Sequence, residues 1–324
     1  MQFTMMLLAV VLCFTASIAH SVGIKKIVVP ADNKGPAINA VQWSPCSSAS
    51  GEILAGPFVL LGVRDCPVAG EHLPLIIISH GFGGSSLSHH DTATALANAG
   101  FIVVSLNHPD DTSTNKTRFH NLKALITRPM DVKRLINFML TSSPDAASIN
   151  PNSIGFFGFS RGGYTGLVLA GAVPDFEKLL IPCSDRTGAT CDHANIKQLP
   201  MLPPSSDPRI MAYVIADPLS NIFATSDSLK HITKPIELWA SQEGGHGVSP
   251  KDVPAIAHNL PMKPTFHLVP NAGHFSFLTT CPPKLAKTLP ELCIDKPNFD
   301  RAAFHKKFNT DMIYFFRKNL IKVP

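Results

Sequence analysis

The stretch Gly158-Phe159-Ser160-Arg161-Gly162 lies between a strand-like segment that ends in an apolar run, residues 152–157, and a helix-like segment of small and apolar residues, 163–170. A serine with glycine at both second neighbours can occupy a sharp strand-to-helix turn that residues with Cβ atoms would crowd. Such a turn exposes the hydroxyl above a parallel sheet and aims helix N–H groups at whatever the serine attacks. The stretch therefore predicts a nucleophilic Ser160, with a plain glycine-rich turn as the alternative.

Strand-like and helix-like segments alternate along the chain from about Leu73 onward. Residues 73–79 form a near-continuous apolar run, as a strand buried on both faces requires. Further strands are expected at residues 101–106, 154–157, 210–216, 236–240 and 266–269, and helices at 91–99, 130–140 and 302–320. This alternation predicts an α/β fold with a doubly wound, mostly parallel sheet and helices on both faces. Residues 25–68, interrupted by prolines and glycines, are expected to hold antiparallel edge strands.

The composition is that of a globular protein. The chain has 324 residues, of which 45% are hydrophobic and 16% charged, enough apolar material for a large core. The net charge of +5 is mild and is not concentrated in a basic run, so a nucleic-acid partner is not expected. We expect one domain over residues 20–324, and the sequence leaves the oligomeric state open.

The N-terminal residues have the pattern of an export signal. An apolar stretch, residues 5–14, is followed by Ser17-Ile18-Ala19, which fits cleavage after Ala19. The alternatives are a membrane anchor, for which the stretch is short, and a buried first strand. We expect residues 1–19 to be a signal peptide and the mature protein to be secreted or periplasmic, with no transmembrane segment.

The cysteines support export. Six remain after residue 19, and an even number in an exported protein suggests disulfides. Proximity in sequence favours Cys46–Cys66, Cys183–Cys191 and Cys281–Cys293. Because the Cys-x-x-Cys spacing of zinc sites is missing from the sequence, structural zinc is not expected. Cys183 and Cys191 fall in a proline-containing insertion, residues 174–207, which is either a lid or substrate wall or a disulfide-clamped surface loop.

A serine hydroxyl is a poor nucleophile until a base takes its proton, so a histidine is required. His274 follows the last expected strand, in the turn-rich loop 270–275, and such loops at the carboxyl ends of parallel strands carry the chemistry of these sheets. His246, in a glycine-rich loop after the preceding strand, is the alternative base. The adjacent His89 and His90 are expected to serve in packing or at the surface rather than in metal binding.

A glycine-rich loop, His80-Gly81-Phe82-Gly83-Gly84, follows the strand at 73–79. A tetrahedral intermediate places negative charge on the former carbonyl oxygen, which two fixed backbone donors can stabilise by about 3 kcal/mol each. The residue after the nucleophile, Arg161, is expected to supply one N–H and Phe82 the other. His80 is expected to fix the loop by hydrogen bonding. A glycine-rich turn without a ligand role is the alternative.

These pieces resemble a known family. They are His80-Gly81-Phe82-Gly83-Gly84, Asn107-His108-Pro109-Asp110, Gly158-Phe159-Ser160-Arg161-Gly162-Gly163, Ala216-Asp217-Pro218 and Gly273-His274-Phe275-Ser276-Phe277. From about Val41 to the C-terminus the chain resembles the α/β-hydrolase superfamily, and within it the dienelactone-hydrolase-like group that also contains the platelet-activating-factor acetylhydrolases. Dienelactone hydrolases use cysteine at the position of Ser160, which argues against that substrate.

The elbow also departs from the usual Gly-His-Ser-x-Gly-Gly of this group, because Phe159 precedes the serine and Arg161 follows it. The Arg161 side chain would either attract an anionic group of the substrate or pair with an acid while its N–H serves the oxyanion. We favour the pairing with an acid.

The orienting acid is expected between the serine and the histidine in the chain. Asp217 directly follows the strand at 210–216, and Glu243 follows the next strand. Many hydrolases carry their acid after that later strand, in an Asp-x-Val-x-Pro setting. Here the same register reads His246-Gly247-Val248-Ser249-Pro250, with histidine in place of the acid. Asp217 is therefore the expected acid, which agrees with the position implied by the acetylhydrolase resemblance, and Glu243 is the alternative.

Together these residues predict a secreted serine hydrolase of carboxylic esters, with Ser160, Asp217 and His274 as its triad and an acyl-enzyme intermediate. Neither a metal nor an organic cofactor is expected. An apolar pocket lining would favour lipid esters, so a phospholipase A, lysophospholipase or acetylhydrolase is the alternative substrate class. A non-catalytic binding protein on a hydrolase scaffold is the alternative of another class, but it should have lost a triad member, and this chain keeps a candidate for each.

Overall fold

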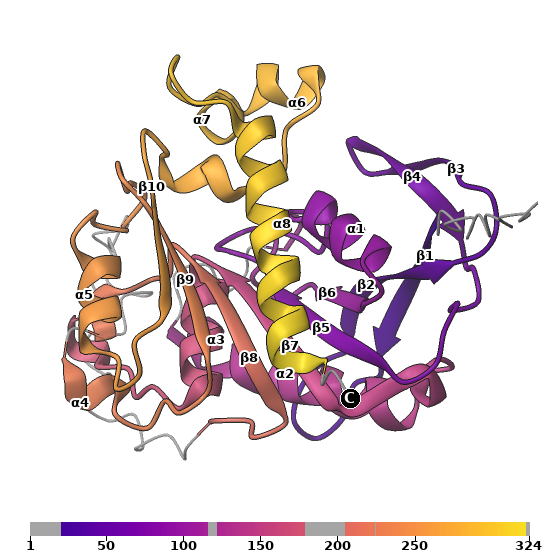
Figure 1. Ribbon diagram of the computed structural model, residues 1–324, viewed down its shortest axis with the longest axis horizontal. Helices are drawn as coiled ribbons and strands as arrows, with labels where there is room; N and C mark the ends of the chain where they lie inside the picture. Colours follow the sequence, from indigo (N-terminus) through magenta and orange to yellow (C-terminus); the bar gives the residue numbers. More distant parts are fainter. Residues whose placement is uncertain (1–20, 116–121, 179–204, 224, 322–324) are drawn as a thin grey trace, which may run out of the picture.

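The computed structural model describes residues 21–115, 122–178, 205–223 and 225–321. Within these residues the strands form one ten-stranded sheet in the order β10-β9-β8-β7-β5-β6-β2-β1-β4-β3, with helices on both of its faces (Figure 1). The predicted signal peptide, residues 1–19, and most of the predicted insertion, residues 174–207, lie outside the described residues.

Six neighbouring strands of this sheet run parallel. They are β5 (Leu73–Ser79), β6 (Ile102–Leu106), β7 (Ile149–Phe159), β8 (Ile210–Ala216), β9 (Ile236–Ser241) and β10 (Thr265–Val269). Every residue of β6 and β9 is buried, as expected of strands covered on both faces. The predicted doubly wound, mostly parallel sheet is thus confirmed.

The remaining strands extend one edge of the sheet. They are β1 (Ser21–Val29), β2 (Ile38–Cys46), β3 (Gly51–Ala55) and β4 (Phe58–Arg64). Antiparallel pairing joins β1 to β2, β3 to β4, and β2 to β6, as the sequence predicts for this region. The contact between β1 and β4 is parallel, which the prediction of antiparallel edge strands did not include.

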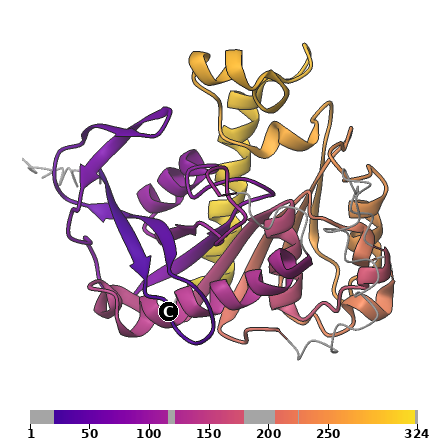
Figure 2. The same cartoon turned by 180° about the vertical axis from the view of Figure 1, so that it is seen from behind.

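The helices divide between the two faces. The face in front in Figure 1 carries α1 (His90–Asn98) and α8 (Arg301–Leu320) over one hydrophobic cluster. The other face, in front in Figure 2, carries α2 (Leu122–Thr141), α3 (Arg161–Ala170) and α5 (Asp252–Asn259) over a second cluster. Short helices complete the described chain: α4 (Ser226–Leu229), α6 (Pro283–Thr288), α7 (Pro290–Cys293), η1 (Ala146–Ser148), η2 (Phe176–Lys178), η5 (Asn221–Phe223) and η6 (His274–Phe277).

Helix α2 begins well before its predicted start at residue 130. It continues through Pro129, which lacks an N–H and normally interrupts a helix. Leu122, Leu125 and Arg128, which precede the proline, are all buried, so tertiary packing compensates for the local cost. The extra turns, residues 122–129, bring Arg128 into the interior of the protein.

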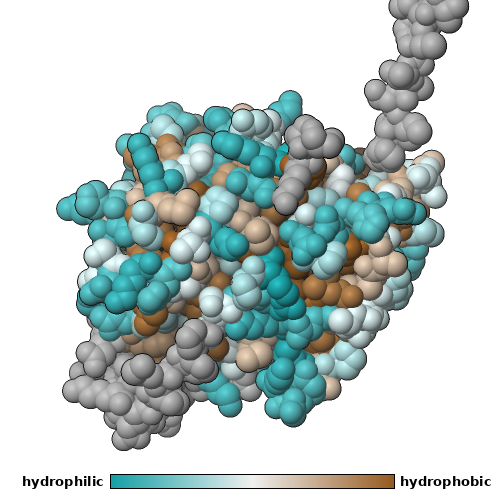
Figure 3. Space-filling model, turned by 60° about the horizontal axis from the view of Figure 1, so that its bottom comes forward, coloured by the Kyte–Doolittle hydropathy of each residue, from teal (hydrophilic) through white to brown (hydrophobic). Residues whose placement is uncertain are grey.

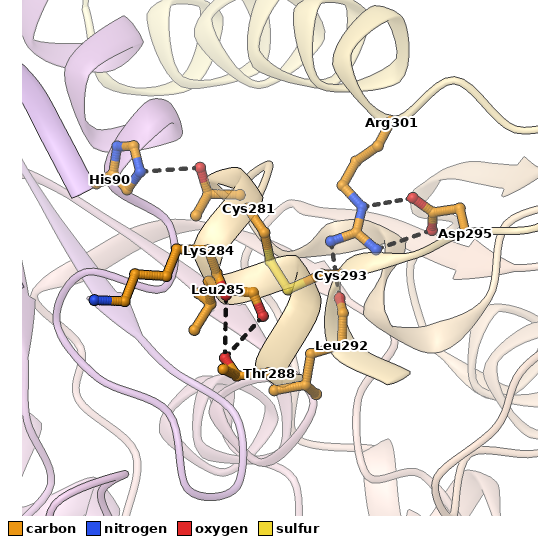
Figure 4. Close-up of a disulfide and its surroundings, with 10 residues drawn as sticks. His90, Cys281, Lys284, Leu285, Thr288, Leu292, Cys293, Asp295 and Arg301 are labelled. Carbon is orange, nitrogen blue, oxygen red and sulfur yellow. Dashed lines mark hydrogen bonds and ion pairs between the residues drawn. A yellow bond between two sulfur atoms is a disulfide. The ribbon is translucent and has the colours of Figure 1, made fainter. Parts of the chain in front are cut away.

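Two of the predicted disulfides are confirmed, Cys46–Cys66 and Cys281–Cys293. The third predicted pair, Cys183–Cys191, lies outside the described residues. The Cys46–Cys66 bond ties the end of β2 to the segment after β4. The Cys281–Cys293 bond closes the segment that carries α6 and α7, beside the ion pair of Arg301 with Asp295 (Figure 4).

The surface agrees with the charge and composition of the chain. The lower face of the molecule is mostly hydrophilic, with hydrophobic residues interspersed (Figure 3). Among the helices of the described ranges, none is both long and apolar enough to cross a membrane.

Strand order determines where a site can form. After β5 the chain adds β6 on one side, then crosses through α2 to add β7 on the other side of β5. In open parallel sheets a crevice opens at the carboxyl ends of the strands where the order reverses in this way. The segments that follow β5, β7, β8 and β10 therefore meet at one edge of the sheet.

Candidate active site

Ser160 stands in the sharp turn between β7 and α3. Its backbone has φ 55° and ψ −117°, a strained combination for a residue with a side chain. The flanking glycines explain how the turn fits. A Cβ at Gly158 would lie 2.2 Å from the Gly162 carbonyl oxygen, and a Cβ at Gly162 would lie 1.9 Å from the Ser79 carbonyl oxygen. Glycine is therefore required at both positions, and the strained turn places the serine at the carboxyl end of β7.

The Ser160 hydroxyl is in contact with the predicted base. The distance from Ser160 Oγ to His274 Nε2 is 3.0 Å. Both residues are buried, and Ser160 itself is 9% exposed. A hydrogen bond from the Ser160 N–H to the Ala216 carbonyl oxygen, 3.0 Å long, fixes the turn against the end of β8.

Asp217 completes this line of hydrogen bonds. It directly follows β8 with φ 41°, and its Oδ2 lies 3.0 Å from His274 Nδ1. The same carboxylate accepts hydrogen bonds from the Ser241 N–H, at 2.7 Å, and from the Ser241 hydroxyl. The side chain of Asp217 is 1% exposed, so these donors compensate a charge that water does not reach.

Glu243 and His246, the alternative acid and the alternative base, lie outside the contacts among Ser160, His274 and Asp217. Glu243 is half exposed and forms an ion pair with Lys296, at 2.6 Å. His246 is exposed and stacks on Phe275, with its ring centroid 6.3 Å from that of His274. Burial, and then the neighbouring His274, lower the pKa of His246. Of the weighed candidates, the structure thus brings Ser160, Asp217 and His274 together, and leaves Glu243 and His246 outside their hydrogen-bond chain.

The loop that carries His274 is braced on two sides. The His274 N–H donates to the Gly244 carbonyl oxygen at 2.9 Å. The Ser276 hydroxyl accepts from the Gly273 N–H and donates to Asp295 at 2.7 Å. Asp295 in turn pairs with Arg301, next to the Cys281–Cys293 disulfide (Figure 4). The histidine is held in place by this bracing.

The glycine-rich loop after β5 packs against the serine. A Cβ at Gly81 would lie 3.1 Å from Ser160 Cβ, a tight contact, so glycine eases the close approach of the two segments. Phe82 follows and is 46% exposed, and the Arg161 guanidinium carbon lies 4.2 Å from the centre of its ring. The two residues predicted to supply oxyanion donors are therefore neighbours across the Ser160 turn.

His80 is buried beneath this loop. Its Nδ1 lies 2.7 Å from the Gly81 carbonyl oxygen, and its Nε2 accepts from the His108 N–H at 3.2 Å. Burial first, and then the nearby Arg128, lower the pKa of His80 to about 3. The imidazole is therefore neutral with its proton on Nδ1, in keeping with the loop-fixing role predicted from the sequence.

A buried charge cluster lies behind the loop. Arg128 donates to Asp111 from Nε at 2.9 Å, and Arg161 Nη1 lies 3.4 Å from the same carboxylate. Burial raises the pKa of Asp111, but the two arginines outweigh it and hold that pKa below its ordinary value. Burial also lowers the pKa of Arg161 to about 10. The Arg161 side chain pairs with an acid, the favoured one of its two predicted roles.

Several polar residues around the site received no role from the sequence, among them His108, which stood there only within a matching motif. His108 bridges the Ser79 hydroxyl, at 2.8 Å, and Asp131, at 3.1 Å. Burial, followed by Arg128, lowers the pKa of His108 well below its ordinary value. The position of His108 just after β6 is a signal that could have found it, since that strand ends at the same sheet edge. Arg128, Asp111 and Ser241 carry no comparable signal.

Comparisons with known proteins agree with this architecture. The solved structure of a ferulic acid esterase from Streptomyces cinnamoneus superimposes with a TM-score of 0.63 at 15% identity, covering 96% of this chain and 92% of that one. No curated protein sequence matches the chain. The chain thus has the α/β-hydrolase fold.

A comparison with models of protein families points to one group among proteins of this fold. Residues 65–138 match the family model described as platelet-activating factor acetylhydrolase, isoform II. That range runs from the segment before β5 into α2 and includes the glycine-rich loop at residues 80–84 and Arg128. The predicted resemblance to the platelet-activating-factor acetylhydrolase group of α/β-hydrolases is confirmed, and it supports an ester hydrolase.

Proposed function

We propose that this protein is a serine hydrolase of carboxylic esters, with Ser160 as nucleophile, His274 as general base and acid, and Asp217 as the orienting carboxylate. The observation that carries the proposal is the unbroken hydrogen-bond chain from Ser160 Oγ through His274 to Asp217, with 3.0 Å at each step. It stands on a strained turn at the carboxyl edge of the sheet, where such a nucleophile is exposed to substrate.

The reaction follows from these contacts. His274 Nε2 takes the Ser160 proton as Oγ attacks the ester carbonyl, and Asp217 stabilises the imidazolium that forms. The imidazolium then protonates the leaving alkoxide, which departs as an alcohol and leaves an acyl-enzyme. Water, deprotonated by His274, attacks the acyl carbon and releases the carboxylic acid, and Ser160 recovers its proton. These steps use no metal and no organic cofactor.

The backbone N–H groups of Phe82 and Arg161 are proposed to stabilise the oxyanion. Both residues adjoin Ser160, one directly in sequence and the other through the close packing of Gly81 on Ser160. Removing one such donor in other serine hydrolases costs roughly 2.7–4 kcal/mol of transition-state stabilisation.

A lipid ester is the alternative substrate, cleaved by a phospholipase A, lysophospholipase or acetylhydrolase activity. The exposed Phe82 ring beside the serine and the acetylhydrolase family match favour it. A non-catalytic binding protein would have no need for a triad with all three members in hydrogen-bond contact.

Export is also part of the proposal. A signal peptide over residues 1–19 would deliver the chain to an oxidising compartment, and the Cys46–Cys66 and Cys281–Cys293 disulfides support such a location.

The acid assignment gives the sharpest test of the triad. We expect Asp217→Asn to lower kcat for p-nitrophenyl acetate by about 10⁴-fold, because the imidazole loses its orienting charge. Glu243→Gln, the matched control, should stay within about threefold of wild type. The opposite ranking would transfer the acid role to Glu243. Rates across p-nitrophenyl esters of increasing chain length, beside a phospholipid, would then separate short-chain from lipid substrates.

A further inference from the structure

Each proposed oxyanion donor belongs to a peptide group whose carbonyl oxygen is itself held. The Ser160 carbonyl oxygen accepts from the N–H groups of Tyr164 and Leu219, both at 3.0 Å. The Gly81 carbonyl oxygen accepts from His80 Nδ1 at 2.7 Å, from Arg128 Nη2 at 3.2 Å and from the Gly84 N–H at 3.3 Å. The carbonyl oxygen of each peptide is thus held by at least two donors on the side away from the N–H.

This arrangement determines where the N–H groups point. A peptide group is planar, and in the trans form its N–H points opposite to its carbonyl. The Gly81–Phe82 peptide is trans. Fixing the Gly81 carbonyl oxygen therefore fixes the direction of the Phe82 N–H.

Arg128 is the main anchor on the loop side. Its side chain is fully buried and reaches from α2 to three acceptors in two segments, the loop after β5 and the segment that carries Asp111. Nη1 donates to the His80 carbonyl oxygen at 2.8 Å, Nη2 to the Gly81 carbonyl oxygen at 3.2 Å, and Nε to Asp111 at 2.9 Å. Two consecutive peptides of the loop are therefore held by one rigid, planar group.

We propose that Arg128 is a positioning residue for the oxyanion hole, which fixes the Gly81–Phe82 peptide so that the Phe82 N–H meets the developing oxyanion. The proposal rests on the proposed esterase function. Through Asp111, which also contacts Arg161, the same guanidinium links the two sides of the hole.

The charge of Arg128 supports the same role as its hydrogen-bond geometry. A cationic donor on a carbonyl oxygen polarises the peptide group and makes its N–H a stronger donor. A lysine in its place would keep the charge but lose the planar fork that serves three acceptors at once. We therefore expect a graded loss, smaller for Arg128→Lys than for Arg128→Met.

The chain offers a matched control on the same helix. Arg134 is also buried, donates to the carbonyl oxygens of Pro30, Gly35 and Pro36, and pairs with Asp32. These acceptors precede β2, away from the Ser160 turn. Loss of Arg134 should lower stability as loss of Arg128 does, without a specific effect on the oxyanion.

The experiment measures kcat and KM of the full chain with a p-nitrophenyl ester, together with the thermal midpoint. We expect Arg128→Met to lower kcat about 100-fold and Arg128→Lys about tenfold, with KM within about threefold, because the loss arises in the transition state. Arg134→Met should keep the kcat of wild type per folded molecule. If Arg128→Met does not fold, the kcat and KM of Arg128→Lys test the positioning role.

A thionoester of the same acid separates positioning from general damage, because its sulfur is a weak acceptor for oxyanion donors. The ratio of ester to thionoester rates should fall in the Arg128 variants and stay unchanged in Arg134→Met. An unchanged ratio, or full activity of both Arg128 variants beside an active wild type, would overturn the role of Arg128 alone. A wild type that hydrolyses no ester would overturn the proposed function and this inference with it.

Discussion

The two peptide groups proposed to bind the oxyanion are held by different kinds of donor. The carbonyl oxygen of Ser160 is fixed by backbone N–H groups, from Tyr164 in α3 and from Leu219 after β8. The carbonyl oxygen of Gly81 is fixed mainly by two side chains, His80 at 2.7 Å and Arg128 at 3.2 Å, with a longer backbone hydrogen bond from the Gly84 N–H at 3.3 Å. One side of the site is thus built from the sheet and its helix, and the other from individual residues beneath a loop.

The difference in donors determines on which side of the site a single substitution can change the geometry. The backbone-held side can change only if the fold changes, because its donors are present whatever the side chains are. The side-chain-held side can be altered by a single substitution that leaves the sheet intact. Rate effects without loss of folding are therefore expected on the loop side, and combined loss of folding and activity on the Ser160 side.

The largest effect is expected at Gly162, on the backbone-held side. A Cβ there would lie 1.9 Å from the Ser79 carbonyl oxygen, and backbone atoms cannot move aside cheaply. Gly162→Ala should destabilise the protein by roughly 3 kcal/mol or more and abolish ester hydrolysis. Gly84→Ala in the loop is the control and should cost less. Its Cβ would meet side-chain atoms of His80 and Ser88, and only at 3.0 Å. Thermal unfolding and p-nitrophenyl acetate rates check both variants, and a stable, active Gly162→Ala would contradict the comparison.

Low pH should lower the stability of the folded protein through the neutral histidines that are buried beneath the loop. The pKa of His80 falls from 6.5 to about 3 on folding, so the unfolded chain binds a proton that the folded chain does not. Stability is therefore lost as the pH falls from about 6.5 towards 3, by up to about 1.4 kcal/mol per pH unit for each such group. His89 and His108, also buried and lowered in pKa, act in the same direction.

Urea unfolding between pH 7 and pH 4.5 measures this slope. A variant without the His80 imidazole, His80→Gln, should show a shallower loss of stability over the same range. A slope identical to that of wild type would mean that His80 takes up its proton without unfolding.

The smallest effect is expected for the Arg161 side chain. The contact of the Arg161 guanidinium with the Phe82 ring and its 3.4 Å pairing with Asp111 together contribute about 1 kcal/mol of stabilisation. The backbone N–H of residue 161 is still present after substitution. Arg161→Met should therefore lower kcat less than about fivefold with neutral esters. A loss as large as that of Arg128→Met would show that the Arg161 side chain itself, and not only its N–H, serves the transition state.

Much of the fold could be predicted because its central strands are continuous apolar runs. The ends of β5 and β8 coincide with the predicted ends, so the residues that follow them, including Asp217, could be placed at one sheet edge. The predicted contact among Ser160, Asp217 and His274 follows from that edge, and their catalytic roles stay predictions. The parallel contact of β1 with β4 depends on long-range packing that local patterns do not encode.

Arg128 illustrates what sequence could not supply. Pro129 suggests a boundary, and the helix was predicted only from residue 130, so the arginine stood outside any element. Its burial depends on three acceptors that come from two separate segments of the chain, residues 80–81 and Asp111. Such a cluster exists only after the chain has folded, and composition and periodicity do not reveal it.

Labelling with a fluorophosphonate tests whether Ser160 is an activated nucleophile, because the reagent phosphonylates only a serine that a neighbouring base activates. The folded wild-type protein should take up one phosphonyl group, mapped by peptide mass spectrometry to Ser160. Ser160→Ala should take up none, and His274→Ala should react far more slowly. No labelling of the folded wild type, or an adduct on a different residue, would contradict the assignment of Ser160 as the nucleophile of an ester hydrolase.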